Sequence, residues 1–149
     1  GMTVCVVEDT PSWCKGRPLV FDFELPEETP SNNVIKGMHY QAYRQLRRMW
    51  RVRVLGRGLG GVRPKQPLPR AALVVERHCA GELDWDNAYG GLKPLLDCLV
   101  QPSPRNPDGL GLVQDDNPRH MPYPPFVLQV RAARGKGRTR IRIYELADS

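Results

Sequence analysis

Ala71-Ala-Leu-Val-Val-Glu-Arg-His-Cys79 is the stretch from which the fold can be worked out. Its run of apolar and β-branched residues predicts a strand, which leads directly into a segment rich in aspartate. The preceding segment, Gly56 to Pro69, holds four glycines and three prolines. This composition is typical of a loop.

Two further elements are predicted before that strand. Leu19 to Leu25 alternates apolar and polar residues with period two, as a half-buried strand does, and Pro26 ends it. Pro30-Ser-Asn-Asn33 is a turn cluster. Beyond it, apolar residues recur at helical spacing and predict a helix from about Tyr40 to Leu55. Those residues are Tyr40, Tyr43, Leu46, Trp50 and Val54.

A second helix and two strands are predicted after the central strand. In chain order we expect a helix over Leu92–Val100, a loop over Gln101–Leu110, a short extended segment at Gly111–Val113, and strands over Phe126–Arg131 and Arg138–Leu146. Gly135-Lys-Gly137 would join the last two as a hairpin. This order predicts an α+β fold, a single mixed β-sheet with its helices packed on one face.

The chain has 149 residues, enough for one domain with a single core. We assign residues 19–149 to that domain and residues 1–18 to an N-terminal extension, which could be an edge strand or a loose segment. No apolar run reaches the roughly 18 residues that a membrane span needs, and no signal-peptide pattern is present. We therefore expect a cytoplasmic protein with no membrane partner. Cys79 and Cys98 lie in apolar runs, which favours buried free thiols.

Basic residues are segregated from acidic ones. The net charge is +6, and the segment from Lys36 to Arg77 holds eleven Lys/Arg against one acid. Polyanions are therefore plausible partners. Two predicted faces concentrate arginine, one on the first helix and one on the last strand. They consist of Arg44, Arg47, Arg48 and Arg51, and of Arg138, Arg140 and Arg142. Each face could bind phosphates or could simply be solvated, and the same alternatives hold for Lys65 in the loop.

The acids gather instead between Glu82 and Asp116. On an extended segment Asp84 and Asp86 would project from the same face, roughly 7 Å apart, where they could ligate Mg²⁺. Asp115 and Asp116 form a second pair after an apolar segment. Either pair could also be an ordinary polar turn. The glycine-containing loops lack the context and the Lys-Ser/Thr of a phosphate loop, so we expect no nucleotide cofactor.

Lys93 and Asp97 lie between the two acid pairs, at positions i and i+4 of the predicted second helix. They could form an ion pair on one helix face. Alternatively, the Lys93 ammonium could point at the acids and neutralise a phosphate there. The residues leave both interpretations open.

These motifs, in this order, resemble the RusA family of Holliday junction resolvases. The resemblance covers roughly Leu19 to Leu146 and includes the turn ending at Asn33 and Gln41-Ala-Tyr43-Arg44. Its most specific part is Asp84-x-Asp86-Asn87, Lys93-x-x-x-Asp97-x-Leu99 and Asp115-Asp116. The chain departs from the family in two places. Lys93 lies seven residues after Asp86, and the connection from Leu99 to Leu112 is longer than usual.

The resemblance implies a RusA-like fold and a homodimer that cuts branched DNA. The activity implied is a Mg²⁺-dependent endodeoxyribonuclease, with Mn²⁺ as a substitute, that resolves four-way junctions by paired symmetric nicks in DNA recombination and repair. Asp84, Asp86, Lys93 and Asp116 would be catalytic, and Asp115 would join the three aspartates at the metal. DNA contacts would come from Asn33, Lys65 and the two arginine faces. Alternatives are a catalytically inactive protein that binds branched DNA and a nuclease that prefers flaps or forks.

Overall fold

The computed structural model describes residues 10–147 and contains one four-stranded sheet. Its strands are β1 (Leu19–Leu25), β2 (Ala71–Cys79), β3 (Phe126–Arg131) and β4 (Arg138–Glu145), in the order β1-β4-β2-β3. β2 runs parallel to β3, whereas β4 is antiparallel to both β1 and β2. The predicted α+β class with a single mixed sheet is therefore confirmed.

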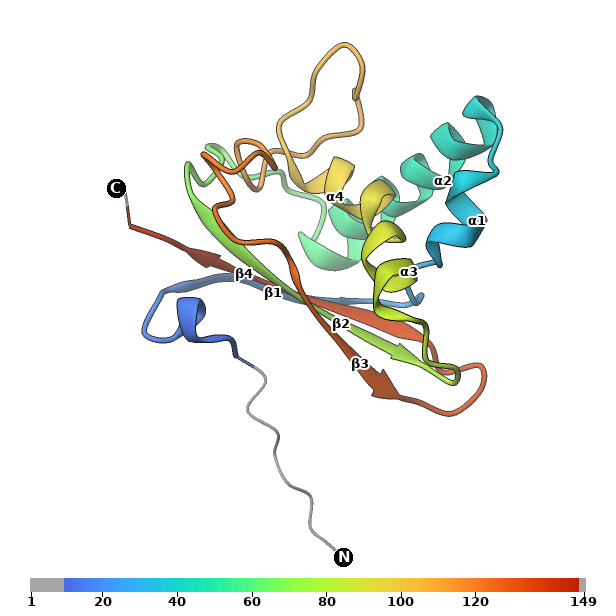
Figure 1. Ribbon diagram of the computed structural model, residues 1–149. Coiled ribbons are helices and arrows are strands. Elements are labelled where there is room, and N and C mark those ends of the chain that lie inside the picture. The colour runs from blue at the N-terminus through green and yellow to red at the C-terminus, as the bar shows by residue number, and fades with distance from the viewer. Residues whose placement is uncertain (1–9, 148–149) are drawn as a thin grey trace, which may run out of the picture.

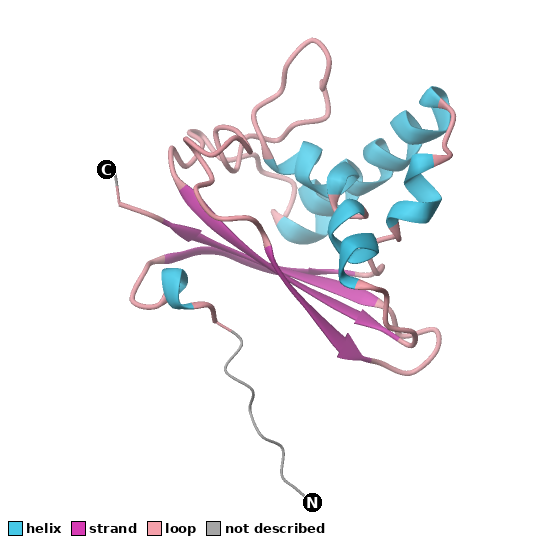
Figure 2. Ribbon diagram, viewed as in Figure 1, coloured by secondary structure: helices cyan, strands magenta, loops and turns pink. Residues whose placement is uncertain are grey.

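The α-helices lie together over one face of this sheet (Figure 1, Figure 2). They are α1 (Asn32–Lys36), α2 (Tyr40–Arg53), α3 (Trp85–Gly90) and α4 (Lys93–Leu99), and a π-helical turn, η2 (Val54–Gly58), continues α2. The two helices expected from apolar spacing are α2 and α4. The predicted turn at Pro30–Asn33 instead leads into α1, whose first turn is capped by the Ser31 side chain.

The predicted hairpin between the last two strands is wrong. Gly135-Lys-Gly137 does connect β3 to β4, but β2 lies between them and pairs with both. All nine residues of β2 are buried. A strand buried on both faces and hydrogen-bonded along both edges occupies the centre of its sheet, and this requirement overrides the local turn signal.

The two faces of the sheet are covered unequally. Ile141 and Ile143 of β4 face the helices and join the main core with Trp50. On the opposite face a short 3₁₀ turn, η1 (Ser12–Cys14), packs Cys14 against Val74 and Tyr144. The described part of the N-terminal extension thus covers the sheet from below in Figure 1. The apolar patch at residues 4–7 lies outside the described residues.

Two other expectations can be compared with the described part of the chain. Cys79 and Cys98 are buried free thiols, as predicted. None of the helices between residues 10 and 147 is long and apolar enough to cross a membrane.

Candidate functional site

Asp84 and Asp86 lie at the start of α3. Asp84 is the residue before the helix, with φ −56° and ψ 145°, and Asp86 is in its first turn. The expectation that both project from one extended segment is therefore wrong, because the chain turns into a helix between them. Both side chains are exposed to solvent. Acids at a helix N-terminus are stabilised by the unpaired backbone N–H groups there, which explains the placement without a ligand.

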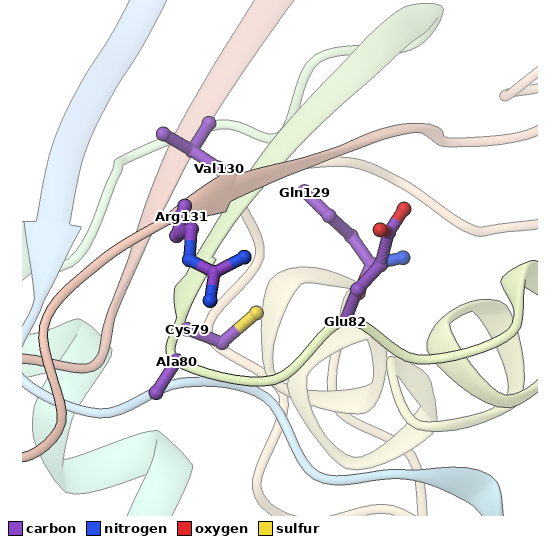
Figure 3. Close-up of a pocket in the computed structure, with 6 residues that line it drawn as sticks. All are labelled: Cys79, Ala80, Glu82, Gln129, Val130 and Arg131. Atoms are coloured by element: carbon purple, nitrogen blue, oxygen red, sulfur yellow. The ribbon is translucent and has the colours of Figure 1, made fainter.

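The segment that carries these acids is held at both ends. The Gln129 side chain of β3 accepts a hydrogen bond from the Leu83 N–H (2.9 Å) and donates one to the Leu83 carbonyl (2.8 Å). Beyond α3, Gly91 passes so close to the Pro30 carbonyl that any Cβ there would overlap with it. Figure 3 shows Gln129 beside Glu82 in a cavity of about 160 Å³ at the ends of β2 and β3. The segment that carries Asp84 and Asp86 is therefore held in place on both sides.

Lys93 begins α4 and lies 3.7 Å from Asp97, so the i, i+4 ion pair, one of the two alternatives that the sequence left open, is present. The Asp97 carboxylate also accepts a hydrogen bond from the Tyr43 hydroxyl (2.7 Å). Burial and this carboxylate raise the pKa of Tyr43. The Lys93 side chain remains largely exposed. Its charge is the smallest influence on the pKa of Asp116 and opposes the rise that desolvation and the Asp115 carboxylate cause.

Asp115 and Asp116 form a hydrogen-bonded turn. The Asp115 carboxylate accepts from the Asp116 N–H (2.7 Å) and from the Asn117 side chain (3.1 Å), which occupies one lone pair on each of its oxygens. Desolvation and the Asp115 carboxylate raise the pKa of Asp116, against the lowering by Lys93. Asp116 lines an apolar pocket with Leu96. Asp115 therefore stabilises the turn, and Asp116 is the more exposed of the two residues.

The donors fit a magnesium ion in kind but are not gathered into a cluster. Among residues 10–147, no group of three or more His, Cys, Asp or Glu side chains lies close enough together to hold a metal ion. Asp84, Asp86 and Asp116 nevertheless offer carboxylate oxygens, the donors that Mg²⁺ prefers. Because Mg²⁺ commonly takes one or two carboxylates together with substrate phosphates, a preassembled cage of three is not required.

The arginine face of α2 is divided by burial. Arg44 and Arg48 are exposed and line a cavity of about 230 Å³, and Arg51 is half-buried. Arg47 is instead 6% exposed, and its Nε donates to Asp108 at 2.8 Å. The expectation that all four share an accessible face is therefore wrong for Arg47. Its partner comes from the loop after α4, 61 residues away, so no local signal could identify it.

The other predicted DNA contacts fall in different places. Asn33 of α1 and Lys65 of the loop before β2 are exposed. Arg138, Arg140 and Arg142 alternate with core residues as predicted, but they project from the sheet face opposite the helices. Each is in an ion pair: Arg138 with Glu24 (3.0 Å), Arg140 with Asp22 (2.9 Å) and Glu76 (3.2 Å), and Arg142 with Glu76 (3.3 Å).

This strand face is therefore largely neutralised. Arg142 is 6% exposed, and the hydrogen bonds and charges of Asp22 and Glu76 raise the pKa of Arg140. These three residues lie on the opposite side of the sheet from the α2 arginines. Their ion pairs stabilise the sheet, and the expectation that they contact DNA stays a prediction.

The sequence interpretation missed three residues that the structure brings to this region. Tyr43 holds Asp97, Asp108 holds Arg47, and Gln129 holds the segment before Asp84. All three make contacts with residues more than 45 positions away in the sequence. The spacing of apolar residues along the chain cannot predict such contacts.

No protein-family model matches this chain, and no curated protein matches it either.

Proposed function

We propose that the protein is a metal-dependent endodeoxyribonuclease that acts on branched DNA as a homodimer, with four-way junctions as its substrate. The observation that carries the proposal is the position of Lys93. Its ammonium lies 3.7 Å from Asp97 at the start of α4, the helix that follows α3 with its acids Asp84 and Asp86. In such an arrangement the lysine can neutralise a phosphate while the carboxylates bind a cation.

Each residue has a distinct role in this proposal. Asp84, Asp86 and Asp116 would supply the one or two carboxylates that hold the cation together with the DNA phosphate. A bound divalent ion supplies positive charge at the phosphate and acidifies water for attack. Lys93 neutralises charge that develops on the scissile phosphate. Asp97 positions Lys93 and is itself fixed by the Tyr43 hydroxyl at 2.7 Å.

The exposed arginines of α2 supply the attraction to DNA. Arg44 and Arg48 lie on the helix layer, as α4 does, and α2 packs against α4. Between residues 10 and 147 Arg44 has no acidic partner, and Arg48 reaches only Asp108 at 4.0 Å. Such side chains contact phosphates without reading bases, which suits recognition by DNA shape. A symmetric dimer would present one site to each of two strands of a junction.

A second candidate is a protein that binds branched DNA without cutting it. The observation in its favour is that no three acids gather into a metal-holding group in the described part of the chain. Both candidates use the α2 arginines. They differ only in whether the bound DNA is cut.

A cleavage assay separates them. We expect nicking of a four-way junction in Mg²⁺ or Mn²⁺ and none in EDTA. Asp84→Asn and Asp86→Asn should abolish nicking while junction binding survives. Glu82→Gln removes an exposed acid from the same segment and is the matched control, which should cut normally. Absence of cleavage with every divalent ion would support the binding protein. Flap and fork substrates in the same assay test the alternative preference.

Salt dependence tests the surface that binds DNA. Arg44→Ala and Arg48→Ala should each reduce the slope of log K against log salt by about 1, because each removes one phosphate contact. Arg47→Met, assayed under conditions in which circular dichroism shows it to be folded, should leave that slope unchanged, because Arg47 is buried against Asp108. Equal slopes for all three variants would remove α2 from the DNA-binding surface.

A further inference from the structure

Trp85 is the exposed tryptophan of this chain. Its side chain is 74% exposed, whereas Trp50 is 1% exposed in the core and Trp13 stacks on Tyr123 at 5.0 Å. Exposing an indole forgoes the favourable burial of a large apolar surface. Its neighbours Asp84 and Asp86 are the two acids that we assign to the cation. An open aromatic ring therefore lies within the proposed catalytic segment.

The ring is positioned rather than left free. Trp85 is the first residue of α3 and meets the Tyr89 ring edge to face, with centroids 6.1 Å apart and planes at 85°. Leu83, two residues before Trp85, is held by two hydrogen bonds between its backbone and the Gln129 side chain. Positioning an aromatic ring in advance lowers the entropy lost when a ligand stacks on it. The fixed backbone and the Tyr89 contact supply that positioning.

The flanking charges limit what this ring can bind. Two carboxylates beside the indole repel a phosphate unless a cation lies between them, but they do not repel an uncharged nucleobase. In a continuous duplex each base is already stacked on both faces. A base that is unpaired at a branch point offers a free face, and stacking on an aromatic side chain is tolerant of sequence.

We propose that Trp85 stacks on an unpaired nucleobase at the branch point of the DNA substrate. This inference rests on the proposed function and specifies its substrate as branched DNA with an unstacked base beside the cut strand. The indole selects the branch by its exposed base, while the α2 arginines hold the backbone regardless of sequence.

Binding and tryptophan fluorescence test this directly, with Ca²⁺ in place of Mg²⁺ so that the DNA remains uncut. The probes are a four-way junction with two unpaired bases at its centre and a perfect duplex of equal length. Saturating junction should quench the Trp85 emission, and the duplex should not. Trp85→Ala should weaken junction binding by about 5- to 150-fold, which corresponds to about 1–3 kcal/mol for one stacked base, and leave duplex binding unchanged.

Trp85→Phe is the matched control, because it keeps an aromatic ring and should recover most of the junction affinity. Since the side chain is exposed, neither variant should alter the fold, which circular dichroism checks. Unchanged emission at saturation, or junction binding by Trp85→Ala as tight as in the original protein, would overturn the inference. An absence of all DNA binding would defeat it together with the proposed function.

The two proposals fail separately. If cleavage is absent but the junction still quenches Trp85, the proposed reaction is wrong and the stacking holds. If the junction is cut at the same rate by Trp85→Ala and bound as tightly, only the stacking is wrong.

Discussion

Replacing Arg47 by methionine should destabilise this protein strongly, although Arg47 belongs to a helix whose other arginines are accessible. Its guanidinium and the Asp108 carboxylate form an ion pair of 2.8 Å in which both side chains are 7% exposed. Methionine keeps the apolar stem but removes the charge. The Asp108 carboxylate is then left buried with only the more distant Arg48 nearby.

The magnitude depends on that burial. Breaking a buried ion pair by removing one partner costs about 3–5 kcal/mol, because the remaining charge stays desolvated. Arg48 lies 4.0 Å from Asp108 and keeps the loss toward the lower end of that range. For a urea m-value of about 2 kcal/mol/M, a loss of about 3 kcal/mol lowers the unfolding midpoint by about 1.5 M.

The matched control uses the same acid. Arg48→Met removes a cation whose side chain is 66% exposed, and a surface pair of this kind is worth about 0–1 kcal/mol. A double variant, Arg47→Met with Asp108→Val, removes both buried charges and should recover much of the loss. Urea unfolding at pH 7 measures all three. If Arg47→Met shifts the midpoint no further than Arg48→Met, burial does not set the strength of this ion pair.

Two further predictions concern the sheet and the close approach of α3. A hydrogen bond from Arg140 lowers the pKa of Asp22. The ionised Asp22 carboxylate therefore stabilises the folded state fully above its ordinary pKa of 3.8, and this stabilisation is lost as the pH falls through the lowered pKa. Asp22→Asn should therefore be less stable than the original protein at pH 7, and the difference should close as the pH falls below 3.8 and through the lowered pKa of Asp22. A difference in urea midpoint that is independent of pH would contradict this. Gly91→Ala should lower the free energy of unfolding by about 3 kcal/mol, because its Cβ would overlap the Pro30 carbonyl. Gly37→Ala is the control: no atom lies within 4 Å of its Cβ, so the free energy of unfolding should change by less than about 1 kcal/mol. Equal thermal midpoints for the two variants would contradict the clash.

Much of the local structure was predictable because neighbouring residues encode it. Alternation in Leu19–Leu25 correctly predicted a half-buried strand, in which Phe23 lies in the core and Asp22 on the other face, since successive side chains in a strand point in opposite directions. Helical spacing likewise located α2 and placed Lys93 and Asp97 on one helix face, where the structure shows that they form an ion pair.

The order of the strands was not predictable in the same way. The short glycine turn between β3 and β4 indicated a hairpin, yet β2 lies between the two strands. The pairing of the strands depends on β2, which is buried on both faces and needs a hydrogen-bonded neighbour along each edge. That is a property of the whole sheet rather than of any turn.

The residue types in the candidate site came from the sequence alone, and their accessibility came from the tertiary structure. The sequence identified acids between Glu82 and Asp116 and a basic helix beside them. Only the fold removed Arg47 from the surface, by bringing Asp108 to it across 61 residues, and exposed Trp85 between two acids. A charge that is both buried and paired, as Arg47 is, is not accessible to a ligand, and burial is decided by contacts between residues distant in the chain.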